Sequence, residues 1–267
     1  MRKYFNQKVI WITGASSGIG EALAYALSAQ GARLILSSRR ESELERVKNA
    51  CPNKGLVKIL PMDLTDIPSL EAKAAHAIVL FDHIDMIIHN GGISSRSLAA
   101  DTNLDVHRRV MEVDYFSYIE LTRLLLSHFH ERNTGHIVVM SSVMGKIGTP
   151  DRSAYAAAKH ALHGYFDCLR AEVSPQGIHV TIFTPGYIRT NVALNAMKGD
   201  GTPLNQNTGN IEHGMAPEKA AQQMLRAMAA KKYEKYIGKF SMERLALIVW
   251  RFFPSLLIRL APGFAPK

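Results

Sequence analysis

Short apolar runs alternate along the chain with longer segments in which apolar residues recur every three or four positions. A short apolar run bounded by turn residues is typical of a buried parallel strand, and the longer period is typical of a helix. The predicted strands are Val9–Ile12, Leu34–Leu36, Leu56–Leu60, a run from Met86 that ends in small residues at Gly92, His136–Met140, Val180–Phe183 and a last strand within Tyr233–Gly238.

Helical patterns separate these strands, which predicts right-handed crossovers and a single α/β domain, a doubly wound parallel sheet with helices on both faces. We assign this domain to residues 1–240, with a substrate lid over 191–215, and assign 241–267 to an amphipathic basic extension. The main predicted helices are Glu21–Gln30, Glu41–Ala50, Leu104–Arg132, Ser153–Val173 and Pro217–Lys231.

The composition fits a folded protein: of the 267 residues, 47% are hydrophobic and 21% are charged. Two cysteines, Cys51 and Cys168, provide no disulfide framework, and the segment before Val9 has no room for the apolar part of a signal peptide. We therefore expect a reducing, cytoplasmic location.

The net charge of +9 is concentrated near the carboxyl end, since residues 231–267 hold eight Lys or Arg and two Glu, a net of +6. No nucleic-acid-binding motif and no arginine-rich run with interleaved aromatics occurs elsewhere, so nucleic acid is not an expected partner. His160 and His163 share a helix face, but no further ligand lies at metal-binding spacing, so no metal site is predicted.

A glycine-rich segment follows the first predicted strand and opens the first long helix. Glycines in this position allow a tight turn, a close approach of phosphate groups and exposure of the helix amides, so we expect a Rossmann-type dinucleotide site rather than a plain turn. The spacing is Gly-x-x-x-Gly-x-Gly, and the candidate cofactor-binding residues are Gly14, Ser16, Ser17, Gly18, Ile19 and Gly20.

The residues at the end of the second predicted strand affect whether NAD or NADP would bind. Ser38 stands where an NAD-binding fold commonly places an acid, and Arg39 follows it. A guanidinium binds a 2′-phosphate through two hydrogen bonds, whereas a carboxylate would repel it, so NADP (NADPH) is favoured over NAD. The alternative is that Arg39 and Arg40 are solvated loop charges.

Two further strand ends hold candidate cofactor contacts. Asp63, followed by Leu64, is expected either to accept from the adenine amino group or to cap a helix. After the fourth strand, Asn90, Gly91 and Gly92 would let a cofactor ring lie against the backbone.

Tyr155 and Lys159 lie four residues apart, on one face of a predicted helix, where they can share a ligand. A nearby ammonium favours the phenolate form of a tyrosine, so this pair suggests proton transfer, although many such pairs are ordinary helix surface. Ser142 follows an apolar strand and is expected at the carboxyl edge of the sheet, where ligands bind in open α/β folds.

Together these motifs resemble the short-chain dehydrogenase/reductase family, from about Lys8 to Thr190. The resemblance implies an oxidoreductase in which Tyr155 exchanges a proton with the substrate oxygen, Ser142 holds that oxygen and Lys159 binds the nicotinamide ribose. It also implies a nicotinamide side lined by Pro185, Gly186, Ile188 and Thr190, and a homodimer or homotetramer. The segment from Ser153 to Glu172 is similar to hydroxysteroid-dehydrogenase-like members, many of which are membrane-associated.

Two positions depart from the family pattern. Asp114 stands where the family usually has Asn, and its carboxylate would attract the Lys159 ammonium and weaken its effect on Tyr155. His89-Asn90-Gly91-Gly92 replaces the usual Asn-Asn-Ala-Gly. The leading hypothesis is an NADP-dependent carbonyl reductase or alcohol dehydrogenase. A regulatory NADP-binding protein with impaired catalysis is the alternative, and a sugar-nucleotide epimerase is a weaker one.

The last segment, 241–260, is strongly amphipathic. Arg244, Arg251, Ser255 and Arg259 lie on one narrow stripe, and the other faces are almost entirely apolar. Arg251 and Pro254 interrupt the segment, which is too short to span a bilayer. We expect either peripheral contact with a membrane or packing on its own domain or a second subunit. Proximity to the substrate entrance would favour an apolar, lipid-like carbonyl or alcohol substrate.

Overall fold

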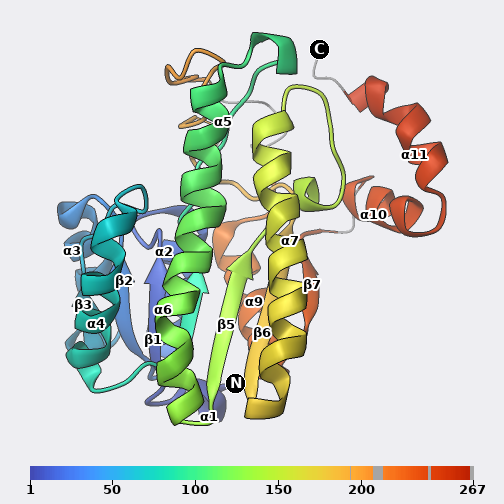
Figure 1. Cartoon of the computed structure of the whole chain (residues 1–267). Helices are drawn as coiled ribbons and strands as arrows, with labels where there is room; N and C mark the ends of the chain where they lie inside the picture. The colour runs from blue at the N-terminus through green and yellow to red at the C-terminus, as the bar shows by residue number, and fades with distance from the viewer. Residues whose placement is uncertain (193, 207–212, 240–241, 265–267) are drawn as a thin grey trace.

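A seven-stranded, entirely parallel sheet forms the centre of the protein (Figure 1), which confirms the predicted α/β fold. The structure, a computed structural model, describes residues 1–192, 194–206, 213–239 and 242–264. The strand order is β3-β2-β1-β4-β5-β6-β7. The strands are β1 (Val9–Thr13), β2 (Arg33–Ser37), β3 (Val57–Ile59), β4 (Met86–His89), β5 (Gly135–Met140), β6 (Ile178–Pro185) and β7 (Glu234–Ile237).

Helices cover both faces of the sheet. One face packs against α2, α3 and α9, and the other against α4, α6 and α7. The α-helices of the described residues are α1 (Arg2–Phe5), α2 (Gly18–Ala29), α3 (Glu41–Ala50), α4 (Leu70–Phe81), α5 (Leu104–Met111), α6 (Ser117–Glu131), α7 (Ser153–Val173), α9 (Pro217–Ala229), α10 (Met242–Phe252) and α11 (Pro254–Leu260).

The alternation of side chains along β1 shows why the strands are apolar throughout. Val9 and Trp11 join the core beneath α4, α6 and α7, whereas Ile10 and Ile12 join the core beneath α2 and α9. The strand order reverses between β1 and β4, and a ligand site is expected at the carboxyl ends of the strands beside such a point.

The predicted helix over Leu104–Arg132 is present, but it contains a π-helical turn at Glu112–Phe116 between α5 and α6. The backbone N–H of Ser117 donates to the Glu112 carbonyl, five residues earlier, as a π turn requires. The Ser117 hydroxyl donates to the Val113 carbonyl at 2.7 Å. The turn thus has its own side-chain hydrogen bond, and it holds Asp114.

The segments after β6 are only partly regular. Residues 193 and 207–212 of the predicted lid lie outside the described residues, and in the described part Met197 bridges to Ser95 and Pro203. The carboxyl-terminal segment forms two helices, α10 and α11, separated at Phe253. Among the described residues no helix is both long and apolar enough to cross a bilayer.

Asp85, just before β4, connects three segments on the amino side of the sheet. Its carboxylate accepts from the Val9 N–H at 2.9 Å and from the Arg132 guanidinium at 3.0 Å, and it lies 3.2 Å from the His83 ring. Burial raises the pKa of Asp85, but these donors outweigh burial and lower the pKa below its ordinary value.

We expect Asp85→Asn to lower the free energy of unfolding at neutral pH by about 1–3 kcal/mol, because the charged hydrogen bonds are lost. A lowered carboxyl pKa stabilises the fold above the unfolded pKa, and the stabilisation is lost as the pH falls through the folded value. The difference between the two proteins in urea unfolding should therefore shrink in acid. Asp105→Asn, at an exposed pair with Arg108, is the control and should change little. A pH-independent difference for Asp85→Asn would contradict this account.

Candidate active site

One cavity of about 750 Å³ lies at the carboxyl ends of the strands and collects nearly all of the predicted site residues. Gly20 is the exception: a Cβ there would lie 2.3 Å from the Gly14 carbonyl oxygen, so this glycine permits packing behind the cavity wall. The predicted residues that line the cavity are Gly14, Ser16, Ser17, Gly18, Ile19, Ser38, Arg39, Asp63, Leu64, Asn90, Gly91, Gly92, Asp114, Ser142, Tyr155, Lys159, Pro185, Gly186, Ile188 and Thr190.

The loops after β1 and β4 are joined by hydrogen bonds. The Thr13 hydroxyl accepts from the N–H groups of Asn90 and Gly91, both at 3.0 Å, and the Asn90 amide donates to the Thr13 and Gly14 carbonyls. Gly14 has a φ of +64°, and a Cβ on it would lie 2.4 Å from the Gly91 Cα. Glycine at position 14 is therefore required by conformation and by space.

At the adenosine end predicted for the cofactor, Arg39 is exposed and makes no ion pair with any described residue. The Asp63 carboxylate accepts from the N–H and the hydroxyl of Thr65, both at 2.9 Å. Burial raises the pKa of Asp63, but these two hydrogen bonds, together with the positive charges of Arg39 and Arg109, outweigh burial and lower the pKa. Asp63 thus closes a local turn and does not cap α4, which begins at Leu70.

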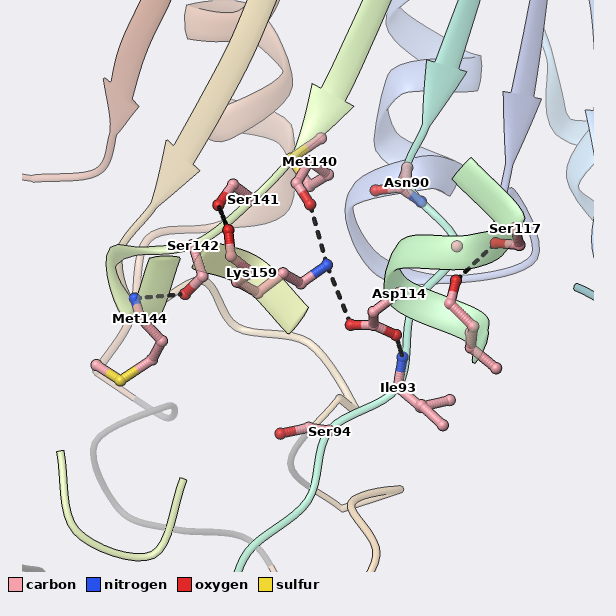
Figure 2. Close-up of polar contacts among 12 residues, drawn as sticks. Asn90, Ile93, Ser94, Asp114, Ser117, Met140, Ser141, Ser142, Met144 and Lys159 are labelled. Carbon is pink, nitrogen blue, oxygen red and sulfur yellow. Dashed lines mark hydrogen bonds and ion pairs between the residues drawn. The ribbon is translucent and has the colours of Figure 1, made fainter. Parts of the chain in front are cut away.

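At the opposite end, the Lys159 side chain on α7 points toward Asp114 and the Met140 carbonyl (Figure 2). Its ammonium donates to the Met140 carbonyl at 3.0 Å and lies 3.1 Å from Asp114 Oδ2. This second contact is an ion pair without hydrogen-bond alignment. Asp114 Oδ1 accepts from the Ile93 N–H at 2.7 Å. The Lys159 Nζ is 5.6 Å from the centre of the Tyr155 ring, so the ammonium lies beside that ring.

Both members of this ion pair are buried. Burial favours the neutral amine of Lys159, but the Asp114 carboxylate outweighs burial and raises the Lys159 pKa. Burial also raises the pKa of Asp114, against the opposing effect of Lys159. We assign the ionised pair, because the Met140 carbonyl favours the ammonium and the Ile93 N–H favours the carboxylate.

The two serines after β5 have different environments. Ser141 is buried; its hydroxyl donates to the Lys159 carbonyl at 3.1 Å and lies 3.0 Å from the His163 ring. Ser142 has extended backbone, and its hydroxyl oxygen accepts from the Met144 N–H at 3.2 Å, within the 3₁₀ turn η5 (Val143–Gly145). Because Ser141 is engaged with α7, Ser142 is the serine that can serve a ligand.

The second departure from the family pattern has a structural explanation. His89 is fully buried, its Nε2 lies 2.9 Å from the Thr122 hydroxyl, and burial lowers its pKa to about 3. It is a neutral core residue. At Gly91 a Cβ would lie 2.7 Å from Leu64 Cδ1, so a larger residue there would require the Leu64 side chain to move.

Several residues that the sequence did not single out also line the cavity. Arg152, three residues before Tyr155, donates to the Ser94 hydroxyl at 2.9 Å and to the Ser95 carbonyl at 3.2 Å. Its spacing from Tyr155 is the one sequence signal that could have identified it. Further lining residues that were missed include Arg109, Val143, Met144, Thr149 and Tyr187. Residues of the segment predicted as a substrate lid also line the cavity: Asn191, Val192, Asn195, Met197, Pro203 and Asn205.

The family model described as short chain dehydrogenase matches residues 8–200. The chain belongs to the short-chain dehydrogenase/reductase family. It is therefore an oxidoreductase of a family that uses a nicotinamide dinucleotide and acts on small molecules.

Two relatives extend this short-chain dehydrogenase similarity over most of the chain. Dehydrogenase/reductase SDR family member 7 of Homo sapiens is 41% identical over 253 residues, which are 92% of this chain and 74% of the relative. Dehydrogenase/reductase SDR family member 7B of Bos taurus is 40% identical, over 100% of this chain and 84% of the relative.

Solved structures agree in fold. A short-chain dehydrogenase from Streptomyces avermitilis superposes with a TM-score of 0.82 at 27% identity, covering 95% of this chain and 94% of its own. A short chain dehydrogenase/reductase from Burkholderia phymatum, solved in complex with NAD, gives a TM-score of 0.82 over 99% of both chains. At 20% identity this second likeness bears on the fold alone.

We expect Asp114→Asn to lower the free energy of unfolding by about 3 kcal/mol, because it leaves a buried ammonium without its counter-ion. In urea unfolding, the double variant Asp114→Asn with Lys159→Met should lose less stability than the sum of the single variants. The same cycle at the exposed pair Arg108 and Asp105 is the control and should show almost no coupling. Additive losses at Asp114 and Lys159 would contradict the ionised pair.

Proposed function

We propose that the protein is an NADP-dependent oxidoreductase that interconverts a carbonyl and an alcohol on an apolar, lipid-like substrate. The observation that supports this most strongly is that one cavity holds Ser142, Tyr155 and Lys159 at one end and the glycine loop with Arg39 at the other. A dinucleotide is a long ligand with phosphates near one end and a reactive ring at the other, and the donors in this cavity fit it.

When bound, the nicotinamide supplies or accepts the hydride. In this proposal the Tyr155 hydroxyl donates its proton to the carbonyl oxygen during reduction and takes it back during oxidation. The Ser142 hydroxyl donates a hydrogen bond to the same oxygen and stabilises its developing negative charge. Lys159 would bind the ribose hydroxyls of the cofactor, and its positive charge favours the Tyr155 phenolate.

Asp114 is a positioning residue in this mechanism. Its ion pair fixes the Lys159 ammonium beside the Tyr155 ring, and its negative charge offsets part of the field that Lys159 exerts on the phenol. The same contact supports the alternative hypothesis of an NADP-binding regulatory protein with impaired catalysis, because a strongly paired lysine activates Tyr155 less.

The preference for NADP rests on Ser38 and Arg39. Both line the cavity, and Arg39 makes no ion pair with a described residue, so its guanidinium is available for a 2′-phosphate. No carboxylate stands at the end of β2, where one would repel this group.

The preference for an apolar substrate rests on the apolar residues among those that line the cavity. They include Val143, Met144, Val192, Met197 and Pro203. Asn191 also lines the cavity, and its amide would bind a polar end of the substrate. Assembly into a homodimer or homotetramer stays a prediction.

We expect Tyr155→Phe to abolish carbonyl-dependent NADPH oxidation while NADPH binding is kept, because only the exchangeable proton is removed. The assay follows absorbance at 340 nm with ketones and aldehydes from short and polar to steroid-sized and long-chain. Tyr165→Phe, on the same helix but outside the cavity, is the matched control. Lack of turnover by the wild type with every compound, despite tight NADPH binding, would favour the regulatory hypothesis.

We expect Arg39→Asp to weaken NADPH binding at least about tenfold and NADH binding much less, because a carboxylate repels the 2′-phosphate. Titration calorimetry with both cofactors measures this difference. Arg123→Asp, an exposed change of equal charge on α6, controls for net charge. An equal loss for NADPH and NADH would remove Arg39 from the proposed phosphate site.

A further inference from the structure

The helices α10 and α11 expose an unusual number of large apolar side chains. Phe252 and Ile258 are 69% and 62% exposed. In Figure 1 the two helices lie at one side of the domain, beyond β7 and α7. The exposed apolar residues of this segment are Met242, Leu245, Ile248, Trp250, Phe252, Phe253, Leu256, Ile258 and Leu260.

A different face of the two helices already packs on the protein. Leu257 is buried against Val143 and Ile147, and Ala246, Leu247 and Val249 are partly buried in the same cluster. The packing expected for a helix docked on its own domain is therefore present. Leu245, Ile248 and Phe252 remain on the outer side, at the i, i+3 and i+7 spacing of one helix face.

A basic groove adjoins this apolar surface. It measures about 400 Å³ and is lined by Arg226, Lys232, Lys235 and Arg244, and no Asp or Glu occurs among the described residues that line it. Arg226, Lys232 and Lys235 are exposed, and none of them forms an ion pair with another described residue. Arg251 lies two turns after Arg244 on α10 and adds charge on the same side of the helix.

We propose that this surface, the outer faces of α10 and α11 together with the basic groove, docks the protein on an anionic phospholipid bilayer. Apolar side chains flanked by cations are the pattern of a helix that lies in the membrane interface. Binding is peripheral. A second copy of the chain fits less well, because a two-fold contact through this face would bring Arg251 and Arg259 of one copy toward those of the other.

The lipid-binding surface borders the cavity. Glu243 on α10 lines the cavity, and Leu257 on α11 is buried in the same apolar cluster as Val143, the neighbour of Ser142. The bilayer would therefore lie next to the cavity entrance. The docking itself does not depend on the reaction proposed for the cavity.

The test is flotation with vesicles of phosphatidylcholine alone and of an equimolar mixture with phosphatidylserine. The wild type should bind the anionic vesicles about tenfold more strongly, and the difference should fall with added salt. Replacing Leu245, Ile248 and Phe252 together by Ser should abolish the binding, and Arg226→Glu with Lys235→Glu should weaken it. The control replaces Val79, Leu98 and Leu104, exposed apolar residues elsewhere, by Ser and should bind like the wild type.

A second measurement uses the unmutated surface. Trp250 on α10 is 37% exposed, whereas Trp11 is buried in the core. Brominated lipids should quench Trp250 fluorescence on binding, and Trp250→Phe should remove the quenching. NADPH binding by each variant reports that the domain is folded.

Three results would overturn the proposal. The first is failure of the wild type to float with anionic vesicles. The second is binding of the Leu245, Ile248 and Phe252 variant at the wild-type level. The third is that the wild type is a dimer by light scattering and does not bind vesicles, while this variant is a monomer. That result would assign the surface to a second copy of the chain. Loss of carbonyl turnover in Tyr155→Phe leaves vesicle binding unchanged, so the two proposals fail separately.

Discussion

The ion pair between Lys159 and Asp114 is the contact on which the arrangement of the site depends. Two opposite charges out of water must be paired, and here the pair also uses the Met140 carbonyl and the Ile93 N–H. Four segments therefore meet at one point: α7, the π turn, the end of β5 and the loop after β4. Tyr155 lies one helical turn from Lys159, so its position follows from the same contacts.

The ion pair fixes the position of Lys159 but also reduces the effect of its charge on Tyr155. A lysine fixed by a carboxylate is precisely placed, but its net effect on a neighbouring phenol is smaller than that of an unpaired ammonium. Glycine at position 92 leaves space for the Asp114 side chain of this ion pair, because a Cβ there would lie 3.2 Å from the Asp114 carboxylate. The small residues after β4 thus make room for an acid as well as for a cofactor.

The sequence predicted the parallel sheet and the limits of α7 well, because buried strands and long amphipathic helices have clear periods. It did not predict the π turn, since an apolar period of three or four residues continues through it. The resemblance to the family showed that Asp114 is a departure. It could not show that Asp114 accepts from Ile93, because the donor is the backbone N–H and the identity of the Ile93 side chain gives no sign of it. Pro254 marked the break in the last segment, but the face that packs inward depends on Val143 and Ile147, far away in sequence.

Leu257 brings α11 into the same apolar cluster as the turn after Ser142. It is buried in one cluster with Val143 and Ile147, so the packing of α11 and the conformation of this turn depend on a shared group of side chains. Allosteric coupling is reciprocal: if a ligand in the cavity favours one seating of α11, occupancy of the outer face favours the same state of the cavity by an equal factor. Under the docking proposal, lipid bound at the outer face would then act on the cavity by the same factor as a cavity ligand acts on lipid binding.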